Sequence, residues 1–495
     1  MNPRKLLVLL LLALAGRCLT MAIVPVIEPS EARYASVGAN MASSGNFMEP
    51  QFVFQGKRLI FEGKPPLFFQ CSGWCCRFLG KSEFAVRLPA LLSGALILLC
   101  LYWCCRKLRN RGEAFLAVTL CLGTPAFYLF AGLCMTDLML AGSISIAVMG
   151  YMLFSAAEDS GGRRTGSLLF FASLGVGMIV KGPVALVLAG MPVFFFLLIN
   201  KRWKELKNHS WAWGILLFLL IALPWYLMMT LRNPDFLEYF FINENFKRFL
   251  FKEYGDRYGA GRESFRGMAF LFFLLANFPF VFFGFFLALR KGFGKIREKL
   301  REVLADPLTG LALLAVVTNT LFWCLTSRVL LTYLLPTIPM CALLVAELIF
   351  RSGKESEILS RTRRVFWISA SFIALTVAVL VWGAFFGERF FDKLPGPVMK
   401  KALKHRELEK YKFYFARNTP YSAEFYLGDL IRNHPKEDRR ESFLNSASCV
   451  LFITRNDFRK LRQSPGTLPG RKKLFTCGVW EVFAPLEPSP GKNKP

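Results

Sequence analysis

The feature that most constrains the fold is a recurring run of about 20 apolar residues, which is the length a helix needs to cross a bilayer. Hydrophobic residues make up 54% of the 495-residue chain. This pattern predicts an all-α polytopic membrane protein with about 11–13 transmembrane helices. The apolar runs begin near Leu6, Leu88, Ala114, Leu138, Leu168, Val184, Trp211, Met268, Leu308, Val329 and Val365.

The basic residues fall in short clusters at every second gap between these runs, and they account for much of the formal net charge of +28. Cytoplasmic loops of membrane proteins are enriched in Lys and Arg, so the alternation predicts a cytoplasmic N-terminus. The charge therefore does not require a nucleic-acid partner. The clusters include Arg4 and Lys5, Arg106 to Arg111, Arg163 and Arg164, Lys201 to Lys207, Arg290 to Lys299, and Arg361 to Arg364.

The N-terminal run has a basic start and a short apolar core, which a secretory or lipoprotein signal also has. Arg17 directly precedes Cys18, and apolar residues continue to Ile27. We therefore expect an uncleaved first span whose Arg17 extends towards the outer face.

This topology predicts the domain organisation. Residues 1–387 form the transmembrane domain, with a first periplasmic loop at 28–87 that carries surface helices and a second large loop at 231–267. Residues 388–485 form a small soluble periplasmic α/β domain, and residues 486–495 form a disordered tail.

Two short apolar runs in the C-terminal part, Cys449–Thr454 and Val479–Phe483, predict strands. Cys449 and Cys477 are the only cysteines of this part, so an extracytoplasmic location makes them a disulfide candidate.

Charged residues that the positive-inside pattern leaves unexplained all fall at the outer ends of spans. Charges at the edge of hydrocarbon are costly unless they are paired or used. Because they come from five separate outer ends, they are candidates for lining one cavity. These residues are Glu31, Glu62, Lys64, Asp137, Lys181, Glu244, Lys247, Arg248 and Arg328.

Nine short motifs occur in a characteristic order over roughly residues 1–345. They are PSEARYA, NMASSGNF, EGKPPL, EFAVRLPALLSG, MTDLML, VKGPVALVL, LPWY, NPDFLEYFF and TYLLPTIP. In this order the chain resembles the bacterial polyprenyl-phosphate-sugar glycosyltransferases of the GT-C type, the superfamily of lipid A aminoarabinose transferase and the protein O-mannosyltransferases.

The resemblance implies an enzyme of the bacterial inner membrane that takes a sugar from a polyprenyl (undecaprenyl) phosphate carrier. The acceptor is lipid A, another envelope glycan or a protein, and the site faces the periplasm. By motif, Glu31, Arg33 and Tyr34 match the acidic-Arg-Tyr motif, and Glu62 and Lys64 match a Glu-Lys-Pro-Pro motif with Lys64 on the donor phosphate. Asp137 matches an acid after the third span, and Lys181 begins a Lys-Gly-Pro motif.

Three departures from the family pattern stand out. Ser30 occupies the place of the presumed key acid, so either Glu31 or Glu28 substitutes for it or the enzyme is weakened. Gly63 separates two residues that the family keeps adjacent, and Asn245 stands where some relatives have His.

The chemistry requires fixed cations for the departing phosphate and a carboxylate that orients or deprotonates the acceptor. Lys64, Lys181, Arg248 and Arg328 are the candidate phosphate-binding cations, and Glu31, Glu62 and Asp137 are the candidate catalytic acids. The same three carboxylates are the candidate ligands if a divalent metal is used, and no organic cofactor is expected. Supporting or substrate-binding candidates are Arg33, Tyr34, Arg87, Glu244, Asn245 and Tyr333.

Each candidate also has a plainer structural explanation. Glu31 can pair with Arg33 or cap a surface helix, Asp137 can cap the next helix, and Lys181 can extend to the membrane surface. The Phe-rich stretch 270–286 can wall a prenyl groove or face the bilayer. Two other functions stay open, namely a lipid or glycan transporter (flippase) and a catalytically weakened family member that acts as a binding protein.

Overall fold

The computed structural model describes residues 3–54, 57–251, 263–290, 296–351, 354–386, 395–405, 408, 411–415, 419–431, 449–454 and 471–485. The chain divides into two compact units, and each is described by itself. The helical unit contains Met1–Leu19, Glu62–Cys71 and Arg87–Val377, and the mixed unit contains Thr20–Phe61, Ser72–Val86 and Ala378–Pro495.

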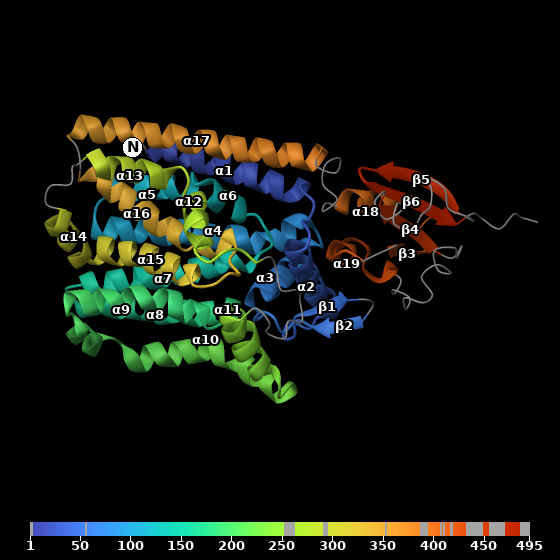
Figure 1. The fold of residues 1–495 in the computed structure, drawn as a ribbon, viewed down its shortest axis with the longest axis horizontal. Coiled ribbons are helices and arrows are strands. Elements are labelled where there is room, and N and C mark those ends of the chain that lie inside the picture. Colours follow the sequence, from blue (N-terminus) through green and yellow to red (C-terminus); the bar gives the residue numbers. More distant parts are fainter. Residues whose placement is uncertain are drawn as a thin grey trace, which may run out of the picture. The chain divides into compact units, whose positions relative to one another are not determined.

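The helical unit consists of helices that run roughly parallel or antiparallel to one another (Figure 1). Its helices are α1 (Pro3–Ile23), α4 (Glu83–Leu108), α5 (Arg111–Leu122), α6 (Pro125–Phe130), α7 (Thr136–Ala156), α8 (Ser160–Lys181), α9 (Val184–Asn200), η1 (Trp203–Asn208), α10 (Trp211–Arg232), η2 (Glu238–Lys247), α11 (Arg248–Leu250), α12 (Met268–Ala276), α13 (Phe280–Arg290), α14 (Ile296–Ala305), α15 (Pro307–Cys324), η3 (Leu331–Leu334), α16 (Thr337–Phe350) and α17 (Glu355–Phe386).

Among the described residues, seven of these helices are long and apolar enough to cross a membrane, which makes the chain a multi-pass membrane protein. The predicted fold class is confirmed. Several of the predicted runs are shorter or broken: α9 and α16 are short apolar helices, and α12 meets α13 at a bend of 95°. Pro279 lies in that bend, where its missing N–H interrupts the helical hydrogen bonds.

Helices α7 and α8 pack closely through glycine. A Cβ atom added at Gly166 would lie 2.5 Å from the Phe154 backbone nitrogen and 2.7 Å from the Gly150 carbonyl oxygen. Small residues at such a contact let two backbones approach each other. The two helices are consecutive and antiparallel, so the start of α7 lies beside the end of α8.

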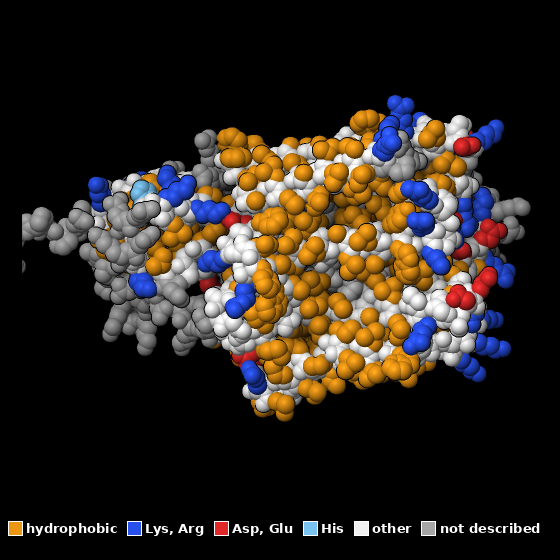
Figure 2. All heavy atoms as spheres, turned by 180° about the vertical axis from the view of Figure 1, so that it is seen from behind, with side chains coloured by type: hydrophobic (Ala, Val, Ile, Leu, Met, Phe, Trp, Pro, Cys, Tyr) orange, Lys and Arg blue, Asp and Glu red, His pale blue; other side chains and the backbone are white. Residues whose placement is uncertain are grey.

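The surface of the helical unit is largely apolar between its two ends, and Lys and Arg side chains gather at one end (Figure 2). Arg109 joins three segments of the helical unit. Its Nε donates to Glu347 Oε2 at 2.8 Å, and its NH2 donates to Asp306 Oδ1 at 2.6 Å. One guanidinium thus joins the segment after α4 to α16 and to the N-cap of α15.

Arg17 differs from its prediction. It is buried within the helical unit and donates from NH2 to the Leu129 carbonyl oxygen at 2.6 Å. A Cβ atom at Gly132 would lie 2.2 Å from Arg17 Nε, so the missing side chain at Gly132 leaves room for the guanidinium. The Leu129 carbonyl, 112 positions away in sequence, thus holds this charge inside, whereas the expectation was extension to the outer face.

The mixed unit combines first-loop elements with the C-terminal region. It contains α2 (Ser30–Ser44), the hairpin β1 (Gln51–Phe54) and β2 (Lys57–Ile60), most of α3 (Leu67–Leu79), α18 (Gly396–Leu403), β3 (Lys412–Phe415), α19 (Tyr421–Leu427), η6 (Gly428–Leu430), β4 (Cys449–Thr454), β5 (Arg471–Cys477) and β6 (Trp480–Pro485).

The C-terminal strands form one sheet in the order β3-β4-β6-β5. Strand β3 is parallel to β4, and β6 pairs antiparallel with both β4 and β5. Strands β4 and β6 correspond to the two predicted runs. The predicted tail, residues 486–495, lies outside the described residues.

The predicted disulfide between Cys449 and Cys477 is wrong in this structure, where both are buried free thiols. Strand β6 lies between β4 and β5, so the two cysteines are separated by two strand spacings of about 4.8 Å each. They also lie at different positions along β6, because Cys477 pairs with Trp480 while Leu451 already pairs with Phe483. Such a separation exceeds the Cα reach of a disulfide.

Candidate functional site

Lys64 and Arg248 meet at one carboxylate in the helical unit. Lys64 Nζ lies 2.7 Å from Glu244 Oε1, and Arg248 NH1 donates to the same oxygen. Lys64 lies in the loop before α3, whereas Glu244 and Arg248 lie one turn apart across η2 and α11. The Glu244 side chain is only 4% exposed, so both cations approach it in a poorly hydrated place.

This environment changes the charge balance of the cluster. Burial lowers the pKa of the Lys64 amine to about 8; Glu244 opposes this shift, while Arg248 and Lys181 add to it. Burial alone would raise the pKa of Glu244, but Lys64 and Arg248 hold it below its usual range. Lys64 is therefore an ammonium at neutral pH that an added anion would stabilise.

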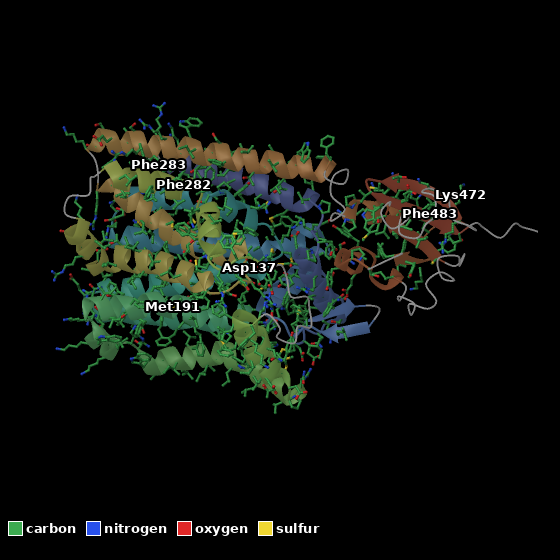
Figure 3. The ribbon with its side chains drawn as sticks, in the orientation of Figure 1. Asp137, Met191, Phe282, Phe283, Lys472 and Phe483 are labelled. Carbon is green, nitrogen blue, oxygen red and sulfur yellow. The ribbon has the colours of Figure 1, made fainter. Side chains whose placement is uncertain are left out.

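A second ion pair joins the neighbouring ends of α7 and α8. Lys181 Nζ lies 2.7 Å from Asp137 Oδ1. Asp137 is in the first turn of α7 and Lys181 is the last residue of α8, so each charge also suits the dipole of its helix. Figure 3 shows Asp137 in the half of the helical unit away from the end where Lys and Arg gather in Figure 2.

The glycine of the Lys-Gly-Pro motif permits this geometry. Gly182 has a φ of 95°, which residues with a side chain rarely adopt. A Cβ atom there would lie 2.7 Å from the ring of Phe240. Pro183 then precedes α9, where its fixed φ suits the start of a helix.

One cavity of about 530 Å³ in the helical unit is lined by the first cluster and by Lys181 of the second ion pair. All four predicted phosphate-binding cations line it, although they are spread over more than 260 positions of the chain. Glu244, Asn245 and Tyr333, which were predicted as supporting residues, also line it. The roles of these residues stay predictions. The four cations are Lys64, Lys181, Arg248 and Arg328.

Two of the lining residues are held by further contacts. Lys181 Nζ lies 4.3 Å from the centroid of the Tyr333 ring, a cation–π contact. Arg328 NH2 lies 3.3 Å from Glu263 Oε1, and the Arg328 side chain is 6% exposed. The cavity thus combines four cations with one lining carboxylate, Glu244.

The rest of the cavity wall is apolar and aromatic. The rings of Phe249 and Phe322 stack at 4.7 Å, and Trp323 lies 4.5 Å from Tyr333. Sequence reasoning overlooked this wall and considered the Phe-rich stretch 270–286. That stretch does not line this cavity, and several of its rings are exposed, among them Phe282 at 48% on α13 (Figure 3). The alternation of aromatic and basic residues in FINENFKRFLF was the available signal.

Glu62 and Arg87 also lie in the helical unit but do not line this cavity. The amide of Asn233, at the end of α10, donates to Glu62 Oε1, and the Glu62 residue is 5% exposed. Arg87, in α4, is 1% exposed.

Glu31, Arg33 and Tyr34 belong to the mixed unit, where they begin α2. Glu31 Oε2 accepts from the Ile27 backbone N–H at 2.9 Å. The Arg33 guanidinium carbon lies 5.3 to 5.7 Å from the centroids of three rings, including those of Phe61 and Tyr34. Tyr34 is buried.

The described residues contain no group of three or more His, Cys, Asp or Glu side chains that can hold a metal ion. Of the three carboxylates considered as ligands, Asp137 is bonded to Lys181 and Glu62 to Asn233, while Glu31 lies in the other unit. A divalent metal held by these carboxylates stays a prediction.

Known proteins resemble this chain in sequence and in fold. Residues 24–240 match the family of dolichyl-phosphate-mannose-protein mannosyltransferases. The chain is 27% identical over 365 residues to the undecaprenyl phosphate-alpha-4-amino-4-deoxy-L-arabinose arabinosyl transferase of Aeromonas hydrophila, and 29% identical over 361 residues to that of Pectobacterium carotovorum. The predicted family resemblance is confirmed. The matches cover 73% and 72% of this chain but only 62% and 61% of those relatives.

Solved structures share the fold. The crystal structure of ArnT from Cupriavidus metallidurans bound to undecaprenyl phosphate has a TM-score of 0.77 at 17% identity and covers 100% of both chains. The oligosaccharyltransferase of Archaeoglobus fulgidus has a TM-score of 0.53 at 10% identity, over 92% of this chain and 70% of that one. The chain thus has the fold of these membrane glycosyltransferases.

Proposed function

We propose that this protein is an integral-membrane glycosyltransferase that moves a sugar from a polyprenyl phosphate to an envelope acceptor, a lipid A-type glycolipid, another glycan or a protein. One observation carries the proposal: four cations from distant parts of the chain line a single cavity that also has an aromatic and aliphatic wall. Cations suit a phosphate and the apolar wall suits the first isoprene units. The names of the relatives, and the undecaprenyl phosphate bound in one structural neighbour, support this donor class.

The cations fit the bond that must break. In the transfer, an acceptor oxygen attacks the anomeric carbon of the sugar, and the bond between that carbon and the phosphate oxygen breaks. The bonding electrons stay on the polyprenyl phosphate, whose negative charge increases in the transition state. Fixed ammonium and guanidinium groups in a poorly hydrated site stabilise that charge. Lys64 and Arg248 are the pair best placed for it, since they already share an anionic oxygen.

The acceptor proton needs a carboxylate base when the acceptor is a hydroxyl group. Asp137, Glu62 and Glu31 are the candidates. Asp137 bonds directly to Lys181, which lines the cavity, and this contact favours Asp137. That pair orients its carboxylate.

The proposed orientation has the N-terminus in the cytoplasm and the C-terminal region in the periplasm of a bacterial inner membrane. The support is the distribution of charge in the helical unit. Helix α8 begins at Ser160, carries Arg163 and Arg164 near its start and ends at Lys181, and its 22 residues span about 33 Å. The basic end suits the cytoplasmic side, which leaves the cavity on the opposite side.

The test uses the purified full chain in proteoliposomes with polyprenyl-phosphate-linked sugars and extracted envelope lipids. We expect release of polyprenyl phosphate together with transfer of the sugar to an acceptor, both followed by mass spectrometry. Lys64→Met and Asp137→Asn should each reduce transfer at least a hundredfold. Movement of the donor across the vesicle membrane without transfer would contradict the proposal and favour a flippase.

A further inference from the structure

The short helix α19 is the C-terminal element that contacts the first-loop helix α2 within the mixed unit. Four residues of the first loop contact Tyr421, Ser422 or Glu424 across about 385 to 394 positions of sequence. Their spacing from 33 to 36 to 40 matches one face of α2. The four residues are Glu28, Arg33, Ser36 and Asn40.

Glu28 is bonded to the start of α19. Its Oε1 accepts from the Ser422 backbone N–H at 2.6 Å, and its Oε2 accepts from the Tyr421 backbone N–H at 3.3 Å. Both N–H groups belong to the first turn of a helix, where they have no partner within the helix. Glu28 therefore satisfies backbone donors of α19, which gives this carboxylate a structural use.

Arg33 lies among aromatic rings, and one of them comes from α19. Its guanidinium carbon is 5.4 Å from the centroid of Tyr421, 5.3 Å from that of Phe61 and 5.7 Å from that of Tyr34. The Tyr421 ring also lies 6.5 Å from that of Phe52, on β1. The C-terminal region thus supplies one wall of the Arg33 environment.

Two further hydrogen bonds continue the contact along α2. Ser36 Oγ donates to the Tyr421 carbonyl oxygen at 3.0 Å, and Asn40 Nδ2 donates to Glu424 Oε1 at 2.5 Å. The backbone of Tyr421 therefore donates to Glu28 and accepts from Ser36, while its ring faces Arg33. Ser36 and Glu424 are both buried, so these bonds are costly to leave unmade.

We propose that Tyr421 and Glu28 are positioning residues, through which α19 holds the Glu31–Arg33–Tyr34 motif of α2 in its working conformation. The inference rests on the proposed function in so far as this motif takes part in donor binding. It assigns the C-terminal region a part in holding this motif, within the mixed unit. It also assigns Glu28 to the scaffold, which leaves Glu31 as the acid nearest to the position of Ser30.

The test compares Tyr421→Leu with Tyr421→Phe in the full-length protein. Leu removes the ring that faces Arg33, whereas Phe keeps it. Both variants keep the backbone N–H and carbonyl that bond to Glu28 and Ser36. We expect Tyr421→Leu to increase amide hydrogen exchange in residues 30–44 at least tenfold and to raise the donor KM at least fivefold, with a smaller change in kcat. Tyr421→Phe should stay within twofold of the wild type in both measurements. Unchanged exchange and KM in Tyr421→Leu would overturn the inference.

Glu28→Gln provides a second variant if Tyr421→Leu does not fold. It has the same size but loses the charge and one acceptor, so exchange in α2 should rise about threefold. Unchanged exchange in this variant would also overturn the inference. Failure of the proposed function is distinguishable, because the wild type would then transfer no sugar while the exchange of α2 would still respond to Tyr421→Leu and not to Tyr421→Phe.

Discussion

Lys64 and Glu244 are 180 positions apart in sequence, yet their side chains form an ion pair of 2.7 Å at the edge of the cavity. Arg248 shares the same carboxylate oxygen. The pair shows that the loop before α3 and the segment after α10 form one charged surface. The pH dependence of binding and the effect of replacing Glu244 both depend on this ion pair.

Binding of polyprenyl phosphate should weaken above a pH of about 8. Burial lowers the pKa of Lys64 to about 8, so the amine is charged below that pH and neutral above it. A bound anion favours the charged form, so affinity is present below the pKa and falls by up to about tenfold per pH unit above it. Titration of wild-type protein, with the fluorescence of Trp323 as one signal, measures this change. Lys64→Arg keeps its charge and should lack this decline; a decline of equal size in that variant would contradict the explanation.

Glu244→Gln should destabilise the empty protein but increase stabilisation by the ligand. The change leaves two partly buried cations without their shared anion, which costs on the order of 3 kcal/mol of unfolding free energy. It also removes the carboxylate that repels an incoming phosphate. Thermal unfolding with and without polyprenyl phosphate measures both effects.

Glu357→Gln is the matched control for this change, because Glu357 also pairs with an Arg four residues later, at 2.9 Å, but is exposed. Glu357→Gln should alter neither the stability of the empty protein nor its stabilisation by the ligand. A smaller ligand-induced shift in Glu244→Gln than in the wild type would show that the carboxylate does not oppose the anion.

Gly182→Ala should disrupt the site. The positive φ of Gly182, with a ψ of −154°, is strained for a residue with a side chain and costs on the order of 1–3 kcal/mol; the new methyl group would also collide with Phe240. Displacement of Lys181 should then reduce transfer at least tenfold. Gly190→Ala, in α9 where a Cβ atom meets nothing within 4 Å, is the control and should be neutral or slightly stabilising. Equal activity of the two variants would refute this role of Gly182.

Arg109→Gln should lower stability without affecting donor affinity. The change leaves Asp306 and Glu347 without their shared partner, at a cost of about 3 kcal/mol. Arg109, Asp306 and Glu347 do not line the cavity, so we expect its charges to be unaffected. Arg106→Gln, an exposed neighbour, should behave like the wild type. Thermal unfolding measures the stability and donor titration measures the affinity. A loss of donor affinity at unchanged stability would contradict the prediction.

The two C-terminal cysteines should both be reactive thiols after unfolding without a reductant. Cys449 and Cys477 are free and buried, so alkylation of denatured, unreduced protein should modify both. Peptide mass spectrometry distinguishes two alkylated peptides from one linked pair, and detection of the linked pair would contradict the structure.

Several features could be predicted because they depend on local pattern. The apolar runs specify membrane helices, because a bilayer leaves a backbone of that length no other way to satisfy its hydrogen bonds. Strands β4 and β6 followed from short apolar runs bounded by polar segments. The four cations were predicted because charged side chains at the outer ends of spans are costly unless they are paired or used. The burial of Arg17 was not predicted, because it depends on the Leu129 carbonyl from elsewhere in the chain. The bend between α12 and α13 was not predicted either, although Pro279 is a local signal for it.

The sequence by itself determined the class of the protein, its membrane helices and the residues that carry charge into the outer ends. Only the tertiary structure decided which of those charges meet. Lys64 pairs with Glu244 and Lys181 with Asp137, while Glu28 serves α19. The hydrophobicity of each residue follows from its own side chain and is therefore present in the sequence. An ion pair depends on the distance between two side chains, and the packing of the helices sets that distance.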